Sequence, residues 1–139
     1  MTVVDASVAV KWFFPERGSS EANALLESGE ALTAPALVRI EVFAAITGKV
    51  RLREILPTQA RAACALWSGF LQSGVLSLVK EDDQILSVAV ELALSIPHPL
   101  QDCLYLALAQ REQAPLVTAD RKFWSRANPL YQPLRLLAE

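Results

Sequence analysis

Short apolar segments alternate with helical segments along the whole chain, and this alternation limits the fold more than any other feature of the sequence. The apolar segments cover residues 2–4, 32–34, 75–79, 115–118 and 134–137. Strands that alternate with helices are typical of a parallel sheet whose crossovers are helical. We therefore predict an α/β fold, a three-layer sandwich with a mainly parallel central sheet, and a single domain over residues 1–139.

The segments between these strands have the apolar periodicity of helices. We expect helices over residues 7–14, 16–28, 35–49, 58–72, 85–94, 99–109 and 121–126. Pro35 is expected to be the first residue of the third helix, and Thr58 is expected to cap the fourth. The third helix is apolar on nearly every face, which predicts that it is buried. The inner face of the fourth is expected to hold Ala62, Ala63, Leu66, Trp67 and Phe70.

Two of the expected strands end at a carboxylate. Asp5 follows the first apolar segment directly, and Asp120 lies two residues after Thr118, the last residue of the fourth. In parallel α/β sheets, ligands bind outside the carboxyl ends of the strands, so both residues are candidates for a binding site. Aspartate is also a favoured helix N-cap, and for Asp5 taken alone that structural role is the more common one.

A third aspartate opens the segment that is expected to form the central helix. Asp102 precedes an apolar run over residues 103–109. A carboxylate in a first helical turn interacts favourably with the helix dipole, so Asp102 alone does not indicate a site. The adjacent residues Asp82 and Asp83 have the same explanation, and we interpret them as structural.

Glu41 is the acidic residue that a structural role explains least. It falls on the apolar stripe of Leu37, Val38 and Ala45, inside the expected third helix, where a capping residue does not occur. An unpaired carboxylate there would cost several kcal/mol. We therefore expect Glu41 to be paired, either with an arginine such as Arg39 or with a metal ion.

Asp5, Glu41, Asp102 and Asp120 can all reach one edge of the predicted sheet. Carboxylates within a few ångströms repel one another, and one of them takes up a proton unless a cation neutralises them. All-oxygen ligation favours Mg²⁺ or Mn²⁺ over zinc or copper. Because His98 is the only histidine, no histidine pair can supply acid and base. The simplest chemistry is then hydrolysis of a phosphodiester by metal-activated water.

Two hydroxyl side chains lie near these carboxylates in the sequence. Thr118 is two residues before Asp120, and Ser7 is two residues after Asp5. Thr118 can hydrogen-bond a carboxylate or a water on the metal, but an ordinary strand threonine needs no such role, and the sequence favours neither explanation. We treat Thr118 and Ser7 as supporting polar residues of the candidate site.

The composition argues against binding nucleic acid by bulk positive charge, since the formal net charge is -2. An acidic metal site remains compatible with this charge, because a bound cation inverts the local field. No apolar window is long enough to span a bilayer, and the first residues lack the basic and apolar regions of a signal peptide. We expect a soluble, cytoplasmic protein that does not bind a membrane.

Four motifs in order along the chain resemble the PIN-domain family. They are the opening VVDASVAVKWFFPE, the helical APALVRIEVFAAI, the segment HPLQDCLYLALAQ and the late LVTADRKF. The chain most resembles the VapC-type toxins of bacterial and archaeal toxin–antitoxin pairs. Each motif is short, but together they cover essentially the whole chain in the family's order and spacing.

The resemblance implies a Mg²⁺- or Mn²⁺-dependent endoribonuclease. The acidic quartet of the family would be Asp5, Glu41, Asp102 and Asp120, with Thr118 as the supporting polar residue before the last aspartate. The resemblance also implies a homodimer, an RNA substrate and a VapB-like antitoxin whose C-terminal segment covers the active site.

The chain departs from many relatives at two places. An asparagine often follows the helix glutamate, where this chain has Phe43, Ala44 and Ala45, and an aromatic residue often precedes the third acidic residue, where this chain has Gln101. Neither departure removes a member of the quartet. They concern substrate contacts and fine positioning rather than the basic chemistry.

Two other classes of function compete with this interpretation. A non-catalytic interaction module would use the carboxylates as caps and ion-pair partners, and Glu41 inside an apolar helix argues against it. A metal-dependent phosphatase or phosphoacceptor domain fits less well, because Ser7 stands where haloacid-dehalogenase-like enzymes need a second aspartate. The acidic pair and late lysine of receiver domains are not found either.

Overall fold

The computed structural model describes residues 1–138 of the chain. In chain order the elements are β1 (Thr2–Val4), α1 (Ala6–Ala9), the 3-10 helix η1 (Val10–Trp12), α2 (Ser19–Glu27), β2 (Leu32–Pro35), α3 (Val38–Arg51), α4 (Pro57–Ser73), β3 (Leu76–Val79), α5 (Asp83–Ser95), α6 (Leu100–Glu112), β4 (Leu116–Thr118), α7 (Arg121–Ala127) and β5 (Leu134–Leu136). The predicted order of strands and helices is confirmed. Within residues 1–138, no helix is both long and apolar enough to cross a membrane.

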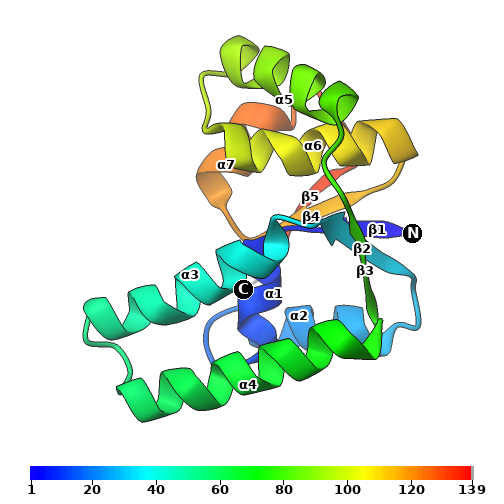
Figure 1. The fold of residues 1–139 in the computed structure, drawn as a ribbon. Helices are drawn as coiled ribbons and strands as arrows, with labels where there is room; N and C mark the ends of the chain where they lie inside the picture. Colours follow the sequence, from blue (N-terminus) through cyan, green and yellow to red (C-terminus); the bar gives the residue numbers. More distant parts are fainter. Residues whose placement is uncertain (139) are drawn as a thin grey trace.

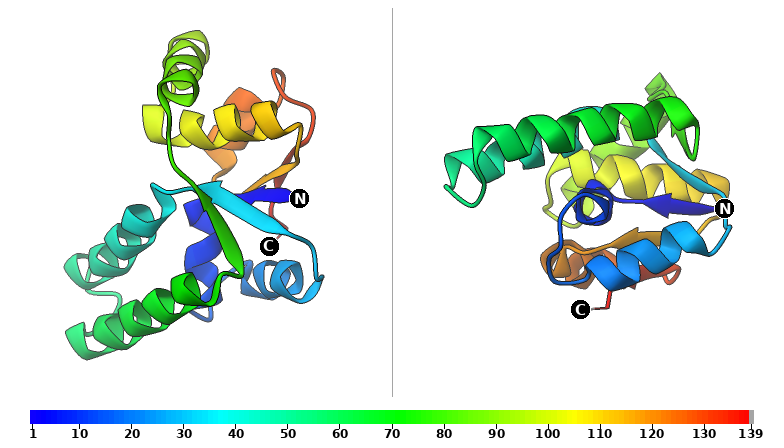
Figure 2. Two further views of the ribbon diagram at one scale, coloured as in Figure 1. Left: turned by 45° about the vertical axis from the view of Figure 1, so that its right-hand side comes forward. Right: turned by 90° about the horizontal axis from the view of Figure 1, so that it is seen from below.

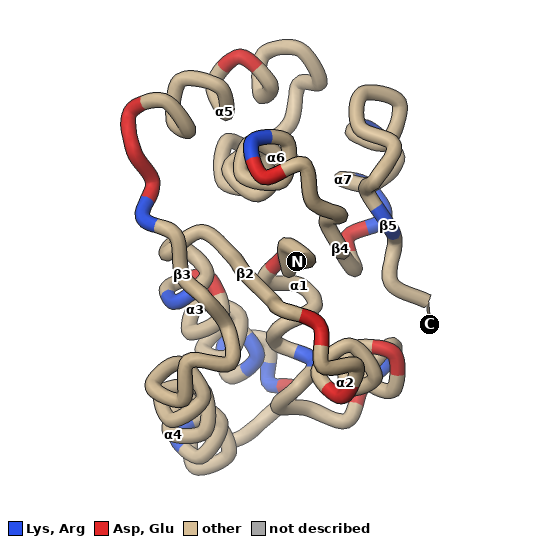
Figure 3. The backbone as a smooth tube through the Cα atoms, turned by 90° about the vertical axis from the view of Figure 1, so that its right-hand side faces the viewer, with Lys and Arg blue, Asp and Glu red and all other residues tan. Residues whose placement is uncertain are grey.

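The strands form one parallel sheet in the order β3-β2-β1-β4-β5. The central strand is β1, where Val3 pairs with Thr33 of β2 on one side and with Leu116 of β4 on the other. Helices α5, α6 and α7 lie on one side of the sheet, and α1, α2, α3 and α4 lie on the other (Figures 1 and 3). The predicted three-layer sandwich with a parallel sheet is confirmed.

The core extends over both faces of the sheet. Every residue of β1, β2 and β4 is buried, as expected for strands that helices cover on both faces. Helix α6 is buried continuously from Cys103 to Ala109, as its apolar run predicts, and α5 packs along its outer side (Figure 1). A helix enclosed in this way is a rigid support for side chains in its first turns.

The carboxyl ends of the parallel strands form one edge, which lies to the left in Figure 1. Helices α1, α3 and α7 begin at this edge, within a few residues of the ends of β1, β2 and β4. The first turn of α6 lies at the same edge (Figure 1). Side chains from four separate parts of the sequence can therefore meet there.

Helices α3 and α4 form a hairpin that extends past the sheet (Figure 2). An aromatic cluster joins this hairpin to the segment after β1. The ring of Phe13 lies 5.7 Å from that of Trp67, and the ring of Trp12 lies 5.1 Å from that of Phe70. Trp67 is fully buried. Such aromatic pairs stabilise beyond their buried area, so the cluster holds the base of the hairpin against the segment that follows the central strand.

The predicted start of the third helix is wrong. Pro35 is not the first residue of α3 but the last of β2, where it pairs with Val79 of the edge strand β3, and α3 begins at Val38. The carboxylate of Glu81 accepts a hydrogen bond from the backbone N–H of Leu37 at 2.7 Å. A partner distant in sequence thus satisfies one of the orphan N–H groups at the start of the helix.

Thr58 does not cap α4, as the sequence predicted. Pro57 is the first residue of the helix, and Leu56 is its N-cap. Proline is favoured at the first position because its missing N–H needs no partner there. The side chain of Gln59 accepts a hydrogen bond from the backbone N–H of Leu56 at 2.7 Å and completes this start.

Both helices of the hairpin are more exposed than their apolar content predicts. Ile40 of α3 is 61% exposed, and Leu66 of α4, which was expected on the inner face, is 62% exposed. Each helix presents only one stripe to the core because the hairpin extends beyond the sheet. In α3 the buried stripe consists of Val38, Val42 and Ile46.

Asp82 and Asp83 open α5, as predicted. Asp82 is its N-cap, and Oδ1 of Asp82 accepts a hydrogen bond from the backbone N–H of Ile85 at 2.8 Å. The structural interpretation of Asp82 is confirmed.

Candidate active site

Asp5 lies directly after the central strand and is buried, with 3% of its surface exposed. It occupies the N-cap position of α1, but its side chain accepts no capping hydrogen bond from that helix. Instead Oδ2 accepts hydrogen bonds from the hydroxyls of Thr118 at 2.7 Å and Ser7 at 2.8 Å. The side chain of Asp5 therefore does not cap α1, although capping is the more common role of an aspartate at this position.

The hydroxyl of Thr118 connects the carboxylate of Asp5 with the backbone of Asp120. Besides donating to Asp5, Oγ1 accepts a hydrogen bond from the backbone N–H of Asp120 at 3.0 Å. Ser7 completes the network, because Oγ accepts from the backbone N–H of Ala119 at 2.9 Å. The two hydroxyls thus join the end of β1 to the end of β4 through side chains.

Asp120 does have a capping role. It is the N-cap of α7, and Oδ1 accepts a hydrogen bond from the backbone N–H of Phe123 at 3.1 Å. The side chain is half-buried. The cap uses one oxygen and fixes the direction of the carboxylate at the carboxyl edge.

Asp102 lies in the first turn of α6, as predicted, and contacts the only histidine of the chain. Nε2 of His98 lies 2.6 Å from Oδ2 of Asp102. Ligand-capable atoms of His98, Asp102 and Asp120 all lie within 4.8 Å of one another. Sequence reasoning missed His98, and its spacing of four residues before Asp102 is the only signal that pointed to it.

Glu41 is paired with a tyrosine. The hydroxyl of Tyr105, a fully buried residue of α6, donates a hydrogen bond to Oε1 of Glu41 at 2.6 Å. The expected partner, Arg39, is exposed, and its Nε donates to the backbone oxygen of Ala36. Tyr105 follows Asp102 by three residues, so both lie on one face of α6, and this spacing was the signal that sequence reasoning missed.

Because α3 begins at Val38, Glu41 lies in its first turn, not in the helix interior as predicted. The charge is half-buried rather than enclosed in apolar side chains. A favourable interaction with the helix dipole can therefore explain Glu41 in part, contrary to the argument from the sequence. The hydrogen bond from Tyr105 is now the stronger reason to assign Glu41 to the site.

The electrostatics show that the carboxylates interact. The pKa of Asp5 is raised from 3.8 to about 7. Burial is the largest cause and the charges of Asp102 and Glu41 add to it, whereas the hydrogen bonds from Thr118 and Ser7 oppose it. Burial also raises the pKa of Glu41, with a smaller contribution from the charge of Asp102.

Asp102 is the residue that connects the cluster electrostatically. Burial raises its pKa, the hydrogen bond with His98 opposes this rise, and the charge of Asp120 adds to it. Its own charge raises the pKa of both Asp5 and Glu41. The structure therefore brings all four predicted acidic residues into one field, with Asp102 at its centre.

This donor set fits a divalent cation with a preference for oxygen. The pKa values of Asp5, Glu41 and Asp102 are raised in part by the charges of neighbouring carboxylates, and such groups are favourably ionised together only when a cation is close. Oxygen donors match Mg²⁺ and Mn²⁺. The buried Asp5 is the strongest indication, since a carboxylate with a pKa of about 7 gains most from a cation.

Basic residues near the edge differ in what they contact. Lys49 binds Glu16 at 2.9 Å, and Lys11 donates to the backbone oxygen of Arg17 at 2.6 Å. Arg121 and Lys122 are exposed at the start of α7, directly after Asp120.

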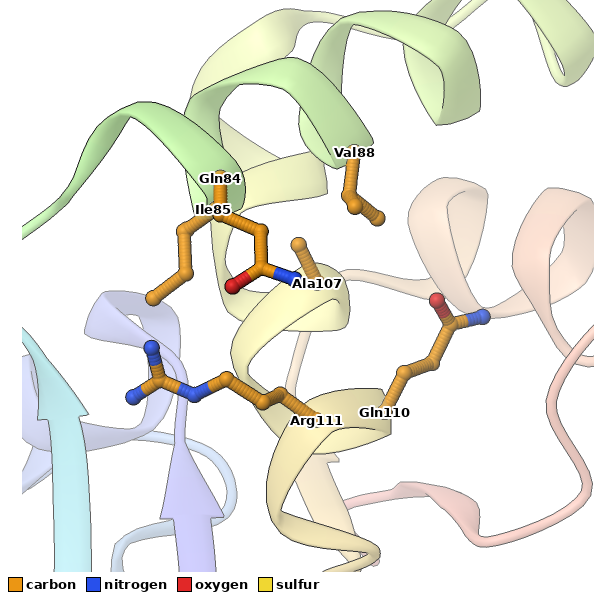
Figure 4. A pocket seen from close by; sticks show the side chains of 6 residues that line it. All are labelled: Gln84, Ile85, Val88, Ala107, Gln110 and Arg111. Atoms are coloured by element: carbon orange, nitrogen blue, oxygen red, sulfur yellow. The ribbon is translucent and has the colours of Figure 1, made fainter.

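A groove between α5 and α6 lies apart from the carboxylates. It has a volume of about 280 Å³ and is lined by Gln84, Ile85, Val88, Ala107, Gln110 and Arg111 (Figure 4). None of its lining residues belongs to the acidic cluster. We assign it no role in the chemistry.

Replacing Tyr105 by phenylalanine is expected to raise the pKa of Glu41 further. The hydrogen bond from the hydroxyl lowers this pKa, and the substitution removes the hydroxyl while the ring still fills the core. The lost hydrogen bond is also expected to lower the free energy of unfolding by about 1 kcal/mol. Carboxyl ¹³C titration by NMR and denaturant unfolding of the metal-free protein measure the two effects.

Tyr131→Phe is the matched control for this prediction. The hydroxyl of Tyr131 donates to the backbone oxygens of Ala109 and Ala114 and contacts no carboxylate there. Tyr131→Phe should lower the free energy of unfolding by an amount similar to that of Tyr105→Phe and leave the titration of Glu41 unchanged. An unaltered Glu41 titration in Tyr105→Phe would contradict the assigned pairing.

Comparisons with known proteins match the chain to one family. A model of the PIN domain matches residues 2–128. A toxin–antitoxin complex from Klebsiella pneumoniae has a chain that superposes with a TM-score of 0.67 at 17% identity, covering 100% of this chain and 99% of that one. The Mycobacterium tuberculosis toxin VapC20, which cleaves the sarcin–ricin loop, superposes with a TM-score of 0.68 at 16% identity. This superposition covers 90% of the present chain and 94% of the VapC20 chain. At these identities the likeness shows a shared fold. No curated protein sequence gave a significant match.

Proposed function

The chain belongs to the PIN-domain family, and from this we propose that it is a VapC-type toxin, a Mg²⁺- or Mn²⁺-dependent endoribonuclease that hydrolyses phosphodiester bonds of RNA. The observation that carries the proposal is the meeting of Asp5, Glu41, Asp102 and Asp120 in one electrostatically coupled cluster at the carboxyl edge. The nuclease family and the toxin-like fold support the same assignment.

In this proposal the four carboxylates hold the cation. When bound, Mg²⁺ or Mn²⁺ would orient phosphate oxygens, activate the attacking water and stabilise charge on the leaving oxygen. The chain's own part is to place the carboxylates before the substrate arrives. Ser7 and Thr118 fix Oδ2 of Asp5, which orients that carboxylate.

The other carboxylates are oriented in the same way, each by its own donor. The backbone N–H of Phe123 fixes Asp120, and Tyr105 fixes Glu41. Glu41 serves as a ligand or positions the attacking water. Preorganised groups of this kind lower the barrier because they need no rearrangement during the reaction.

A non-catalytic interaction module explains the site less well. In such a module the carboxylates would serve as caps and ion-pair partners. Asp120 does cap α7, but the side chain of Asp5 caps no backbone group and shares its oxygen with two hydroxyls in a buried position. A buried carboxylate with no cationic partner destabilises a purely structural protein.

The same proposal includes the partners of a toxin. We propose a VapB-like antitoxin whose C-terminal segment covers the active site, and the toxin–antitoxin complex among the solved structures supports such a partner. The chain would act as a single domain over residues 1–139 and as a homodimer in the cytoplasm. The exposed Arg121 and Lys122 would contact RNA phosphates beside the carboxylates.

Removal of metal is expected to abolish cleavage of RNA. Antitoxin-free protein is incubated with a mixed pool of structured RNAs in Mg²⁺, in Mn²⁺ or in EDTA. Because the cation supplies several kcal/mol of charge stabilisation, cleavage in EDTA should fall by at least about a hundredfold. Adding excess Mn²⁺ back should restore it. Cleavage that continues unchanged in EDTA would contradict the proposed chemistry.

A further inference from the structure

The proposed chemistry makes no direct use of His98, although this residue joins two of the carboxylate-bearing helices. It lies in the loop before α6 and is only 7% exposed. Its Nε2 lies 2.6 Å from Oδ2 of Asp102, and its Nδ1 lies 3.1 Å from Nη1 of Arg126. The imidazole also stacks on the ring of Phe123, with centroids 5.0 Å apart.

The contact with Arg126 determines where the imidazole carries its proton. A guanidinium only donates hydrogen bonds, so Nδ1 must accept from Arg126. The proton of the ring is then on Nε2, and this N–H points at Asp102. Nη1 of Arg126 also donates to the backbone oxygen of Pro97 at 3.0 Å, which holds the guanidinium in place.

The groups that fix His98 belong to the helix that begins at another carboxylate. Phe123 and Arg126 are both on α7, whose N-cap is Asp120. His98 therefore ties the first turn of α6 to α7. The imidazole thus links Asp102 to the helix that Asp120 caps.

We propose that His98 is a positioning residue for Asp102. Its Nε2–H holds Oδ2 of Asp102, which would leave the other oxygen of this carboxylate to bind the cation that the cluster would hold. The proposal rests on the proposed metal-binding function of that cluster. A donor behind a metal-binding carboxylate typically changes metal affinity by about 10- to 100-fold.

Direct coordination by His98 is the competing possibility, because its ring atoms lie within 4.8 Å of ligand-capable atoms of Asp102 and Asp120. Both ring nitrogens are already engaged, one with Asp102 and one with Arg126. Coordination would require one of these contacts to break. The geometry therefore favours the positioning role.

Two substitutions separate the functions of the ring nitrogens. In His98→Gln the side-chain amide can place an N–H near the position of Nε2, whereas in His98→Asn the amide reaches only as far as Nδ1. We expect His98→Gln to bind Mn²⁺ nearly as tightly as the wild type. We expect His98→Asn to bind it about 10- to 100-fold more weakly. Titration calorimetry without RNA measures both affinities.

A spectroscopic measurement distinguishes positioning from coordination. Because His98 is the only histidine, untagged protein labelled with ¹⁵N-histidine has a single imidazole. NMR of the metal-free protein should show the tautomer with its proton on Nε2. Pulsed EPR of the Mn²⁺-bound protein should show no coupling from a directly coordinated imidazole nitrogen.

Three results would overturn the proposal. They are equal Mn²⁺ affinity in the wild type and both variants, an equal loss in both variants, and a directly coordinated imidazole. Thermal unfolding in EDTA checks that both variants are folded. Failure of the nuclease proposal is distinguishable, since wild-type protein that binds Mn²⁺ but cleaves no RNA would refute only the enzyme activity. Wild-type protein that binds no Mn²⁺ would refute both.

Discussion

RNA cleavage by the Asp5→Asn variant is expected to fall by at least about a hundredfold. The substitution removes one charge from the cluster that would hold the cation, so both metal affinity and charge stabilisation decrease. The fold should remain, because asparagine keeps an oxygen that accepts from Ser7 and Thr118. Cleavage rates at saturating Mn²⁺ and the circular dichroism of the variant measure the two parts of this prediction.

Asp83→Asn is the matched control for this loss. It makes the same chemical change at an exposed residue in the first turn of α5, outside the carboxylate cluster. Its cleavage rate should equal that of the wild type. Retention of activity in Asp5→Asn would show that a contaminating nuclease or another site is responsible.

Asp5→Asn is also expected to stabilise the metal-free protein above neutral pH. Burial raises the pKa of Asp5 from 3.8 to about 7, so the folded protein holds this proton more tightly than the unfolded chain. Protonation of Asp5 therefore favours folding fully below about pH 4, and this contribution is lost as the pH rises to about 7. Asparagine has no charge to bury at any pH.

The free energy of unfolding of Asp5→Asn should therefore exceed that of the wild type by an amount that grows with pH. Between pH 5 and pH 8 the free energy of unfolding of Asp5→Asn should gain on the order of 3 kcal/mol relative to the wild type. Urea unfolding in EDTA at both pH values measures it. A difference that is the same at pH 5 and pH 8 would show that Asp5 is not a buried carboxylate in the metal-free state.

Mn²⁺ should reverse the order of stability. A cation that binds only the folded protein stabilises it by mass action, and the wild type offers one more carboxylate than the variant. Both results together would show that Asp5 destabilises the metal-free protein and stabilises the protein that holds the proposed cation.

The fold was predictable because its signals are local. Apolar strands, helical periodicity and carboxylates at strand ends are each read from a few neighbouring residues. This was enough to predict the parallel sheet and to single out Asp5 and Asp120 at strand ends and Glu41 within an apolar helix. The structure brings these three together with Asp102, which local signals alone did not distinguish from a helix-dipole partner.

The partners of the carboxylates were not predictable in the same way. Glu41 meets Tyr105, 64 residues later in the chain, and the apolar run around Tyr105 gave it the character of a core residue. Arg39, the expected partner, is nearer in sequence but directed elsewhere. The start of α3 depends on the distant Glu81, so its first residue could not be placed from the local sequence.

The central position of β1 determines when the site can form during synthesis. The first strand of the chain pairs with β4, and the carboxylate of Asp5 is held by Thr118, 113 residues later. Contacts of such long sequence separation form only after the intervening chain is available. A partly synthesised chain thus has no assembled acidic cluster. The cluster can assemble only after the segment that carries Thr118 and Asp120 has left the ribosome.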